Sequence, residues 1–338
     1  MNFLNEKSVL RSFIKNYNSV VISISEINNI VSINEMASLS PNELVEMSER
    51  YFRFQVEKVA KKVSSLSGNR LVMLAGPSSS GKTTTASLLS KDLLKNGRGA
   101  KVISLDDFYR NQNEKIYFED GTPDFETVKS LDTEKIRECL SAITEKGECL
   151  LPRFSFITGK REKEPVHFKL QKDEVVIVEG LHALNPVITD SLDSEKLTKL
   201  YVSVSSRVMN KNEVFLSKRD IRFIRRMVRD YLFRNAEVDY TFYLWNGVRM
   251  GEDRYLFPFK NLADIKIDSF HSYEMCVLKE PALSLLSHIE KDSPYFERSK
   301  KLFEKLSQFV SIEKEKMPES SLLCEFIGQE ELHFESKK

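Results

Sequence analysis

Short apolar runs alternate with amphipathic stretches through the middle of the chain. The runs are rich in Val, Ile and Leu, which is typical of strands that are buried on both faces of a parallel sheet. The amphipathic stretches between them predict crossover helices, so the pattern favours an α/β fold with a parallel sheet flanked by helices. The predicted strands span residues 70–75, 101–105, 174–179, 200–204 and 264–270.

Helical spacing of apolar side chains predicts helices between these strands and also ahead of the first one. The leading helix is expected to begin at Ser40, with Pro41 in its first turn and Glu43 three residues after the cap. Its buried face is predicted to carry Leu44, Met47, Tyr51, Phe54 and Val59. The later helices are predicted at about 82–95, 131–146, 219–234 and 238–249.

The composition excludes several classes of protein. With 338 residues, of which 41% are hydrophobic, the chain can bury a sizeable core, and a net charge of +1 gives no global attraction to nucleic acid or membranes. The four cysteines form no C-x-x-C pair, so neither a disulfide framework nor a structural zinc site is indicated. No apolar segment approaches the roughly 20 residues that span a bilayer, and we expect the protein to stay in the cytoplasm.

A glycine-rich loop between the first predicted strand and the next helix carries the strongest chemical signal. Residues 76–83 fit the phosphate-loop (Walker A) pattern G-x-x-x-x-G-K-[ST] at every fixed position. Glycines allow successive backbone N–H groups to face one anion, and the helix N-terminus adds partial positive charge. The residues predicted to bind the phosphates of ATP are Gly76, Pro77, Ser78, Ser79, Ser80, Gly81, Lys82, Thr83 and Thr84.

The phosphate loop predicts a nucleotide site without specifying the reaction. Lys82 is expected to reach the β- and γ-phosphates, and Thr83 to offer its hydroxyl to Mg²⁺. Guanine-nucleotide switches share this loop, but they also carry a D-x-x-G motif, and no Asp of this chain has Gly three residues later. The sequence therefore favours a phosphotransferase over a switch.

Acidic residues follow two of the predicted strands. Asp106 and Asp107 come after the strand that ends at Leu105, and Glu179 ends the run of buried β-branched residues 175–178. Ligands of open α/β sheets bind beyond the carboxyl ends of the strands, where an acid can hold Mg²⁺ or accept a proton. For Asp107 an ordinary turn cap is an equally good reading, whereas a buried Glu179 needs a partner or a metal.

A basic helix is predicted near residues 219–234. Arg222, Arg225, Arg226 and Arg229 recur at steps of three or four residues, while apolar side chains occupy another face. Planar guanidinium groups suit phosphate oxygens, so the helix is expected to display its arginines above the transferring phosphoryl group. A solvated basic face is the alternative. A nucleic-acid patch is disfavoured, because the run lacks interleaved aromatic residues and the rest of the chain is not basic.

Four pieces of sequence, in their order and spacing, resemble the uridine kinase/phosphoribulokinase family of P-loop kinases. They are residues 76–83, 104–110 (Ser-Leu-Asp-Asp-Phe-Tyr-Arg), 176–180 (Val-Ile-Val-Glu-Gly) and 220–230 (Asp-Ile-Arg-Phe-Ile-Arg-Arg-Met-Val-Arg-Asp). Residues 152–161, 245–258 and 321–328 are similar to a bacterial uridine-kinase-like branch of that family. The resemblance covers about residues 67–330.

The resemblance implies transfer of the γ-phosphate of ATP to a nucleoside 5′-hydroxyl, with uridine as the first acceptor to consider. Asp106 matches the general base on that hydroxyl, and Thr83, Asp106 and Glu179 match the Mg²⁺ environment. Arg222 and Arg225 match catalytic arginines of a lid, and Arg229 matches a lid arginine over the ATP phosphates.

The acceptor side departs from well-characterised uridine kinases. A Tyr and a His that surround the pyrimidine in those enzymes would fall at Phe154 and Gly159 here. The acid that binds the ribose would fall near Lys129, unless Glu126 or Asp124 takes its place. The side chains expected to bind the substrate are Asp106, Tyr109, Phe154 and Arg161, with core packing and a solvated turn as alternatives for the last two.

The same resemblance predicts how the chain is divided. Residues 1–66 are expected to form a helical N-terminal extension, similar to the last part of a synthetase-like segment of longer relatives. Residues 67–310 would form the kinase domain, with a lid at about 207–234, and residues 311–338 a tail packed on it. Family members often form homo-oligomers, although the sequence carries no interface signature.

Two rival functions remain open at this point. One is a kinase for another small alcohol, such as a sugar phosphate or pantothenate. The other is an ATP-binding regulator or RNA-associated protein without turnover. Intact residues at Lys82, Thr83, Asp106 and Glu179 argue against the regulator.

Overall fold

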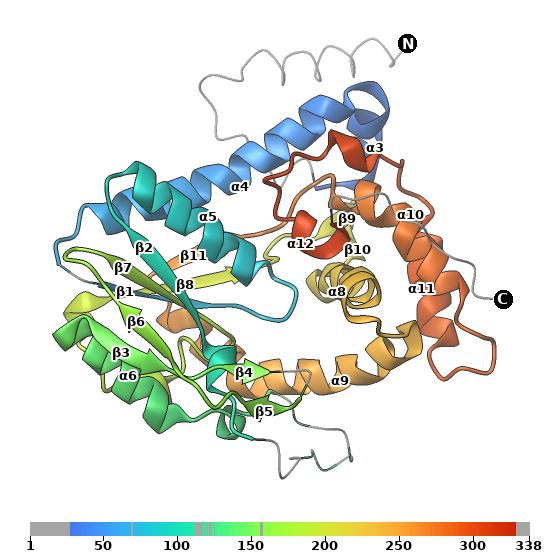
Figure 1. Cartoon of the computed structure of the whole chain (residues 1–338). Coiled ribbons are helices and arrows are strands. Elements are labelled where there is room, and N and C mark those ends of the chain that lie inside the picture. Colours follow the sequence, from blue (N-terminus) through green and yellow to red (C-terminus); the bar gives the residue numbers. More distant parts are fainter. Residues whose placement is uncertain are drawn as a thin grey trace.

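The computed structural model shows a central sheet with helices on both faces (Figure 1). It describes residues 28–68, 70–111, 117, 119, 121, 124, 126–155 and 158–328.

In the part of the chain that the structure describes, five parallel strands form the central sheet in the order β11-β8-β1-β7-β2. Glu179, the last residue of β7, is level with Leu74 of β1 and with Ser104 of β2. The chain segments that follow β1, β2 and β7 therefore leave the sheet at one edge, where ligands of such sheets bind. The strands are β1 (Arg70–Ala75), β2 (Ala100–Ser104), β7 (Val175–Glu179), β8 (Leu197–Ser203) and β11 (Ile265–Asp268).

Helices bury both faces of this sheet. Alternate side chains of β1 enter two apolar clusters, with Val72 and Leu74 in one and Leu71 and Met73 in the other. The first cluster also takes α3 (Ile30–Leu39), α4 (Pro41–Ser64), α5 (Lys82–Lys95), α8 (Lys218–Arg234), α9 (Val238–Tyr255), α10 (Glu274–Ser287), α11 (Phe296–Leu306) and α12 (Cys324–Ile327). The second takes α6 (Thr133–Lys146) and α7 (Pro186–Thr189). This arrangement confirms the predicted α/β class.

Among the described residues, three antiparallel strand pairs lie outside the central sheet. They are β3 (Glu148–Leu151) with β6 (Val166–Lys169), β4 (Phe154–Ser155) with β5 (Lys160–Arg161), and β9 (Val208–Asn210) with β10 (Glu213–Leu216). Short 3₁₀ turns complete the described elements: η1 (Leu105–Phe108), η2 (Val128–Ser130), η3 (Ser194–Lys196), η4 (Phe257–Leu262) and η5 (Lys314–Lys316).

The predicted face of the leading helix is right only in part. Leu44 and Val59 are buried as predicted, and Met47 and Tyr51 are half-buried, but Phe54 is 56% exposed. The buried stripe also includes residues outside the predicted face, namely Val45, Phe52, Val56 and Val63. Ser40 is the N-cap as expected, but its side chain makes no capping hydrogen bond.

The helices before the sheet share its core. Residues of α3 and α4 belong to the same apolar cluster as Val72 of β1 and Leu89 of α5. Residues 1–27 of the predicted extension and residues 329–338 of the predicted tail lie outside the described residues. Within the described part of the chain, every helix is too short or too polar to cross a lipid bilayer.

A C-terminal segment, residues 317–328, covers the start of α5. Its side chains Leu322, Leu323, Phe326 and Ile327 are buried in the first apolar cluster. Leu322 packs against Gly81, the N-cap of α5, so closely that a Cβ added to Gly81 would lie 2.4 Å from its Cδ1 atom. The segment and the phosphate loop are therefore packed as one unit.

This packing predicts unequal effects of alanine at two glycines. Gly81 and Gly97 have similar left-handed φ values of 83° and 79°, so each Gly→Ala change should cost about 1 kcal/mol of backbone strain. A Cβ at Gly97 meets nothing within 4 Å, whereas at Gly81 it meets Leu322, whose side chain is fully buried. We expect Gly81→Ala to lose about 1–3 kcal/mol more than Gly97→Ala in urea unfolding. Equal losses would contradict the tight packing.

Candidate active site

The phosphate loop lies at the carboxyl edge of the sheet, between β1 and α5. A Cβ at Gly76 would lie 2.3 Å from the carbonyl oxygen of Val202 in β8, so only glycine fits where the loop leaves the sheet. Gly81 then begins α5 in the left-handed conformation. Lys82 bends back over the loop and donates to the carbonyl oxygen of Pro77 at 3.3 Å.

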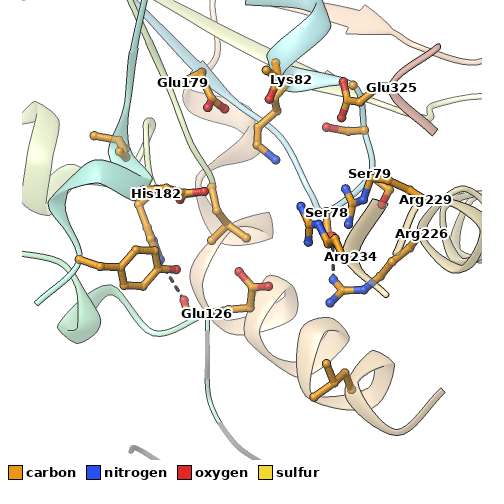
Figure 2. A pocket seen from close by; sticks show the side chains of 18 of the residues that line it. Ser78, Ser79, Lys82, Glu126, Glu179, His182, Arg226, Arg229, Arg234 and Glu325 are labelled. Carbon is orange, nitrogen blue, oxygen red and sulfur yellow. Dashed lines mark hydrogen bonds between the residues drawn. The ribbon is translucent and has the colours of Figure 1, made fainter. Parts of the chain in front are cut away.

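A cavity of about 570 Å³ opens in front of this loop, within the usual range for small-molecule sites. It brings together many of the residues predicted from the sequence: Ser78, Ser79, Ser80, Gly81, Lys82, Thr83, Asp106, Tyr109, Glu179 and Arg229. The cavity also contains Glu126, His182, Arg226, Arg234 and Glu325. Figure 2 shows Lys82 reaching between Glu179 on one side and the arginines of α8 on the other.

Two predicted acids meet beside Lys82. Asp106 lies in η1, directly after β2, and Glu179 ends the neighbouring strand β7. Ser104 links them, because its hydroxyl donates to Glu179 Oε1 at 2.8 Å and accepts from the backbone N–H of Asp106 at 3.3 Å. The protein surrounding each carboxylate raises the pKa of Asp106 and of Glu179, and the charge of Lys82 opposes both shifts.

The donor set suits a hard cation such as Mg²⁺. Thr83, Asp106 and Glu179 line the same cavity and offer only oxygen atoms. No group of three or more His, Cys, Asp or Glu side chains is arranged to hold a metal in the described residues. Since Mg²⁺ usually takes one or two carboxylates and completes its shell with phosphate oxygens and water, this arrangement fits it.

Glu126 and His182 form the wall opposite the phosphate loop. The Glu126 carboxylate points into the cavity in Figure 2, and its backbone oxygen is 2.9 Å from His182 Nε2. Burial by the surrounding protein raises the pKa of Glu126 to about 7, with Glu252 raising it further and Arg226 and Lys82 opposing. Burial lowers the pKa of His182 to about 4, so this imidazole is neutral at pH 7.

The neutral His182 has a defined tautomer. Since a carbonyl oxygen only accepts, the Nε2 nitrogen facing Glu126 carries the proton. The other nitrogen, Nδ1, is buried without a hydrogen-bond partner among the described residues. Of these two residues the sequence indicates only Glu126, as one alternative for the ribose acid, because no motif signals His182.

Arg222 and Arg225 lie behind the phosphate loop rather than in the cavity. Arg222 Nε donates to the carbonyl oxygen of Ser78 at 2.8 Å, and Arg225 Nη1 donates to that of Ser79 at 3.3 Å. Each guanidinium is paired with a buried carboxylate, Arg222 with Glu252 and Arg225 with Glu274. These contacts indicate that both arginines hold the loop backbone in place.

The prediction that α8 displays its arginines above the transferring phosphoryl group is therefore wrong for Arg222 and Arg225, and so is the alternative of a solvated basic face at these two residues. Arg222, Arg225 and Arg226 are buried along with the apolar side chains of the helix, because their charges are matched inside the protein. The partners Glu252 and Glu274 come from α9 and α10, 30 and 49 residues away in sequence. Neither partner had been predicted.

Three further arginines of α8, Arg226, Arg229 and Arg234, face the cavity. Arg226 donates to the Ser78 hydroxyl at 2.9 Å, and Arg226, Arg229 and Arg234 all pair with the buried Asp230. Figure 2 shows these three guanidinium groups on one side of the cavity. A single carboxylate thus fixes three cations beside the phosphate loop. The sequence predicts Arg226 and Arg229 on this side of the site, whereas Arg234 is not predicted.

Two predicted substrate residues do not line the cavity. The Phe154 side chain is buried and packs on Tyr109, with ring centroids 5.5 Å apart. Arg161 donates to the backbone oxygens of Phe108 and Tyr109 and pairs with Asp132. Both residues therefore support the η1 turn that carries Asp106, and Tyr109 alone of the three lines the cavity.

A family profile and a curated relative both connect this chain with uridine kinases. The profile of the phosphoribulokinase / uridine kinase family matches residues 71–275. A uridine kinase of Staphylococcus aureus (strain JH9) is 27% identical over 210 residues, which cover 61% of this chain and 91% of that protein.

Two solved structures are similar to parts of this chain at low identity. The "Possible Uridine Kinase" of Bacillus stearothermophilus is 17% identical, covers 64% of this chain and 98% of its own, and superposes with a TM-score of 0.46. The D-glycerate 3-kinase of Cryptococcus neoformans is 14% identical and has a TM-score of 0.41; the match covers 59% of this chain and 87% of that protein.

The family profile spans more than half of the chain and includes the phosphate loop, Asp106, Glu179 and α8. The protein belongs to the phosphoribulokinase / uridine kinase family of kinases.

Proposed function

We propose that the protein transfers the γ-phosphate of ATP to the 5′-hydroxyl of a nucleoside, with uridine as the first candidate. The observation that carries the proposal is the meeting of Lys82, Thr83, Asp106 and Glu179 in one cavity at the carboxyl edge of the sheet. A phosphate loop beside a carboxylate that can deprotonate an alcohol is what phosphoryl transfer to a hydroxyl requires.

The donor is proposed to bind with its phosphates along residues 76–84. Backbone N–H groups of the loop and the first turn of α5 would face the phosphate oxygens, and Lys82 would contact the β- and γ-phosphates. Thr83, Asp106 and Glu179 would hold Mg²⁺, which offsets negative charge on the phosphates when it is bound.

In the transfer step, the Asp106 carboxylate accepts the proton of the acceptor hydroxyl. The hydroxyl oxygen forms a bond to the γ-phosphorus as the bond from that phosphorus to the bridging β–γ oxygen breaks, and ADP leaves. Arg226, Arg229 and Arg234 stand where they can stabilise the charge on the transferring group. Arg222 and Arg225 act indirectly, by fixing the carbonyl groups of Ser78 and Ser79.

The acceptor is proposed to rest against Glu126 and His182. A carboxylate accepts hydrogen bonds from sugar hydroxyls, which supports Glu126 in the ribose-binding role that Lys129 does not fill. The named activity of the Staphylococcus aureus relative supports uridine as the first compound to test.

A different small alcohol is the second candidate. The position that carries the pyrimidine-reading His in characterised uridine kinases is Gly159 here, and Phe154 is packed on Tyr109. A sugar phosphate or a pantothenate-like alcohol needs no side chain that recognises a base. The Glu126 carboxylate can accept hydrogen bonds from the hydroxyls of such an alcohol as it can from those of a ribose. ADP release that depends on such an alcohol, and not on a nucleoside, would select this alternative.

Replacement of the proposed base separates catalysis from binding. We expect Asp106→Asn to lower kcat at least about 100-fold, because an amide cannot accept the hydroxyl proton. ADP affinity, measured by calorimetry, should change less than about threefold. Asp107→Asn is the matched control. The Asp107 carboxylate is next to Asp106 in sequence but does not line the cavity, so this variant should retain transfer.

Full transfer activity in Asp106→Asn would show that another group is the base. ATP binding by the unaltered protein without ADP release in the presence of any nucleoside or small alcohol would favour the non-catalytic regulator.

The pKa of Glu126, about 7, predicts the pH dependence of acceptor use. Its carboxyl is protonated below that pKa, and the neutral form accepts hydrogen bonds poorly. We therefore expect kcat/KM for the acceptor to fall about tenfold for each pH unit below 7 and to level off above it. Glu126→Gln should have lower activity, and its pH–rate profile should lack this fall in kcat/KM below pH 7. An unchanged fall in the variant would assign the ionisation elsewhere.

A further inference from the structure

A carboxylate of the C-terminal segment is bound at the start of α5. Glu325 Oε2 accepts from the Thr84 hydroxyl at 2.7 Å and from the Thr84 backbone N–H at 3.3 Å. Thr84 is in the first turn of the helix that follows the phosphate loop. Its N–H is among those that have no partner within the helix and that attract anions.

The position of Glu325 coincides with the proposed phosphate site. Walker A loops bind the α- and β-phosphates of a nucleotide with backbone N–H groups of the loop and the start of the helix. Glu325 lines the same cavity as Lys82 and Thr83. Figure 2 shows Glu325 and Lys82 among the side chains of this cavity. A nucleotide phosphate that approached Thr84 would therefore meet a negative charge already hydrogen-bonded there.

The segment that carries Glu325 is held firmly. Phe326 is fully buried next to Glu325, and the guanidinium of Arg225 lies 4.9 Å from the centre of its ring. Ser321 is hydrogen-bonded to the hydroxyl of the buried Tyr273 and caps the following turn through the N–H of Leu323. The Glu325 side chain is only half-buried, so it can rotate away from Thr84 while the backbone stays anchored.

The phosphate loop has carboxylates close to it, and these affect how it can bind a further negative charge. Glu325 and Glu179 both lie close enough to interact electrostatically, since the charge of Glu325 contributes to raising the pKa of Glu179. Lys82 is the cation between them in Figure 2. A triphosphate would add further negative charge to a site that already contains these two carboxylates.

We propose that Glu325 is a determinant of nucleotide affinity, a carboxylate that competes with a nucleotide phosphate for the N–H and hydroxyl of Thr84. The inference rests on the proposed use of residues 76–84 as a triphosphate site. Binding of ADP or ATP requires the Glu325 carboxylate to release Thr84. The C-terminal segment thus lowers nucleotide affinity through this side chain, independently of which alcohol is the acceptor.

The test compares ADP binding by calorimetry in the full chain and in three variants. Glu325→Gln keeps the shape of the side chain but removes its charge, and Glu325→Ala removes its reach. Glu315→Gln, at an exposed position just before the segment, is the control for the same change in net charge. We expect the Kd for ADP to fall about tenfold in both Glu325 variants and to stay unchanged in Glu315→Gln.

Steady-state kinetics give a second readout. The KM for ATP should fall in Glu325→Gln while kcat does not rise, because only competition at the binding site has been removed. Unchanged or weaker ADP binding in Glu325→Gln, with nucleotide binding and transfer intact in the unaltered protein, would overturn this inference alone. Absence of ADP binding in every variant and in the unaltered protein would overturn the proposed function as well.

Discussion

The fixed backbone of the phosphate loop is the constraint on which the rest of the site depends. When the N–H groups of such a loop face an anion, its carbonyl groups face the protein interior and need donors there. Arg222 and Arg225 supply those donors, and Glu252 and Glu274 balance their buried charges. Removal of one member would leave an unpaired buried charge, which is costly, so the four side chains form one structural unit.

This unit ties distant parts of the chain to the loop. The arginines come from α8, their carboxylates from α9 and α10, and the C-terminal segment packs on the same side through Leu322 and Phe326. Helices beyond the central sheet, on the right of Figure 1, thereby support a loop formed by β1 and α5. The predicted division into extension, kinase domain and tail stays a prediction, although the described parts of all three share one apolar cluster.

Local patterns in the sequence predicted the strands of the sheet, α5, α6, α8 and α9, because the apolar runs and caps that specify them are short-range signals. The phosphate loop, Asp106 and Glu179 were found for the same reason. The burial of Arg222 and Arg225 could not be predicted, because it depends on long-range contacts. The spacing of Arg222 and Arg225 is the same on a solvated helix and a buried one, and only the distant Glu252 and Glu274 decide between them. α10 was missed because its sequence contains Pro281, a residue that usually ends a helix, and because apolar residues surround most of its circumference.

The central claim is that one cavity aligns the triphosphate tail held by residues 76–84 with a hydroxyl at Asp106. A crystal structure with Mg²⁺, ADP, aluminium fluoride and uridine tests it most directly. The account predicts a planar fluoride group next to Lys82, with the 5′-oxygen of uridine on its far side within hydrogen-bond distance of the Asp106 carboxylate. A nucleotide bound away from the phosphate loop, or a uridine hydroxyl that does not face Asp106, would contradict it.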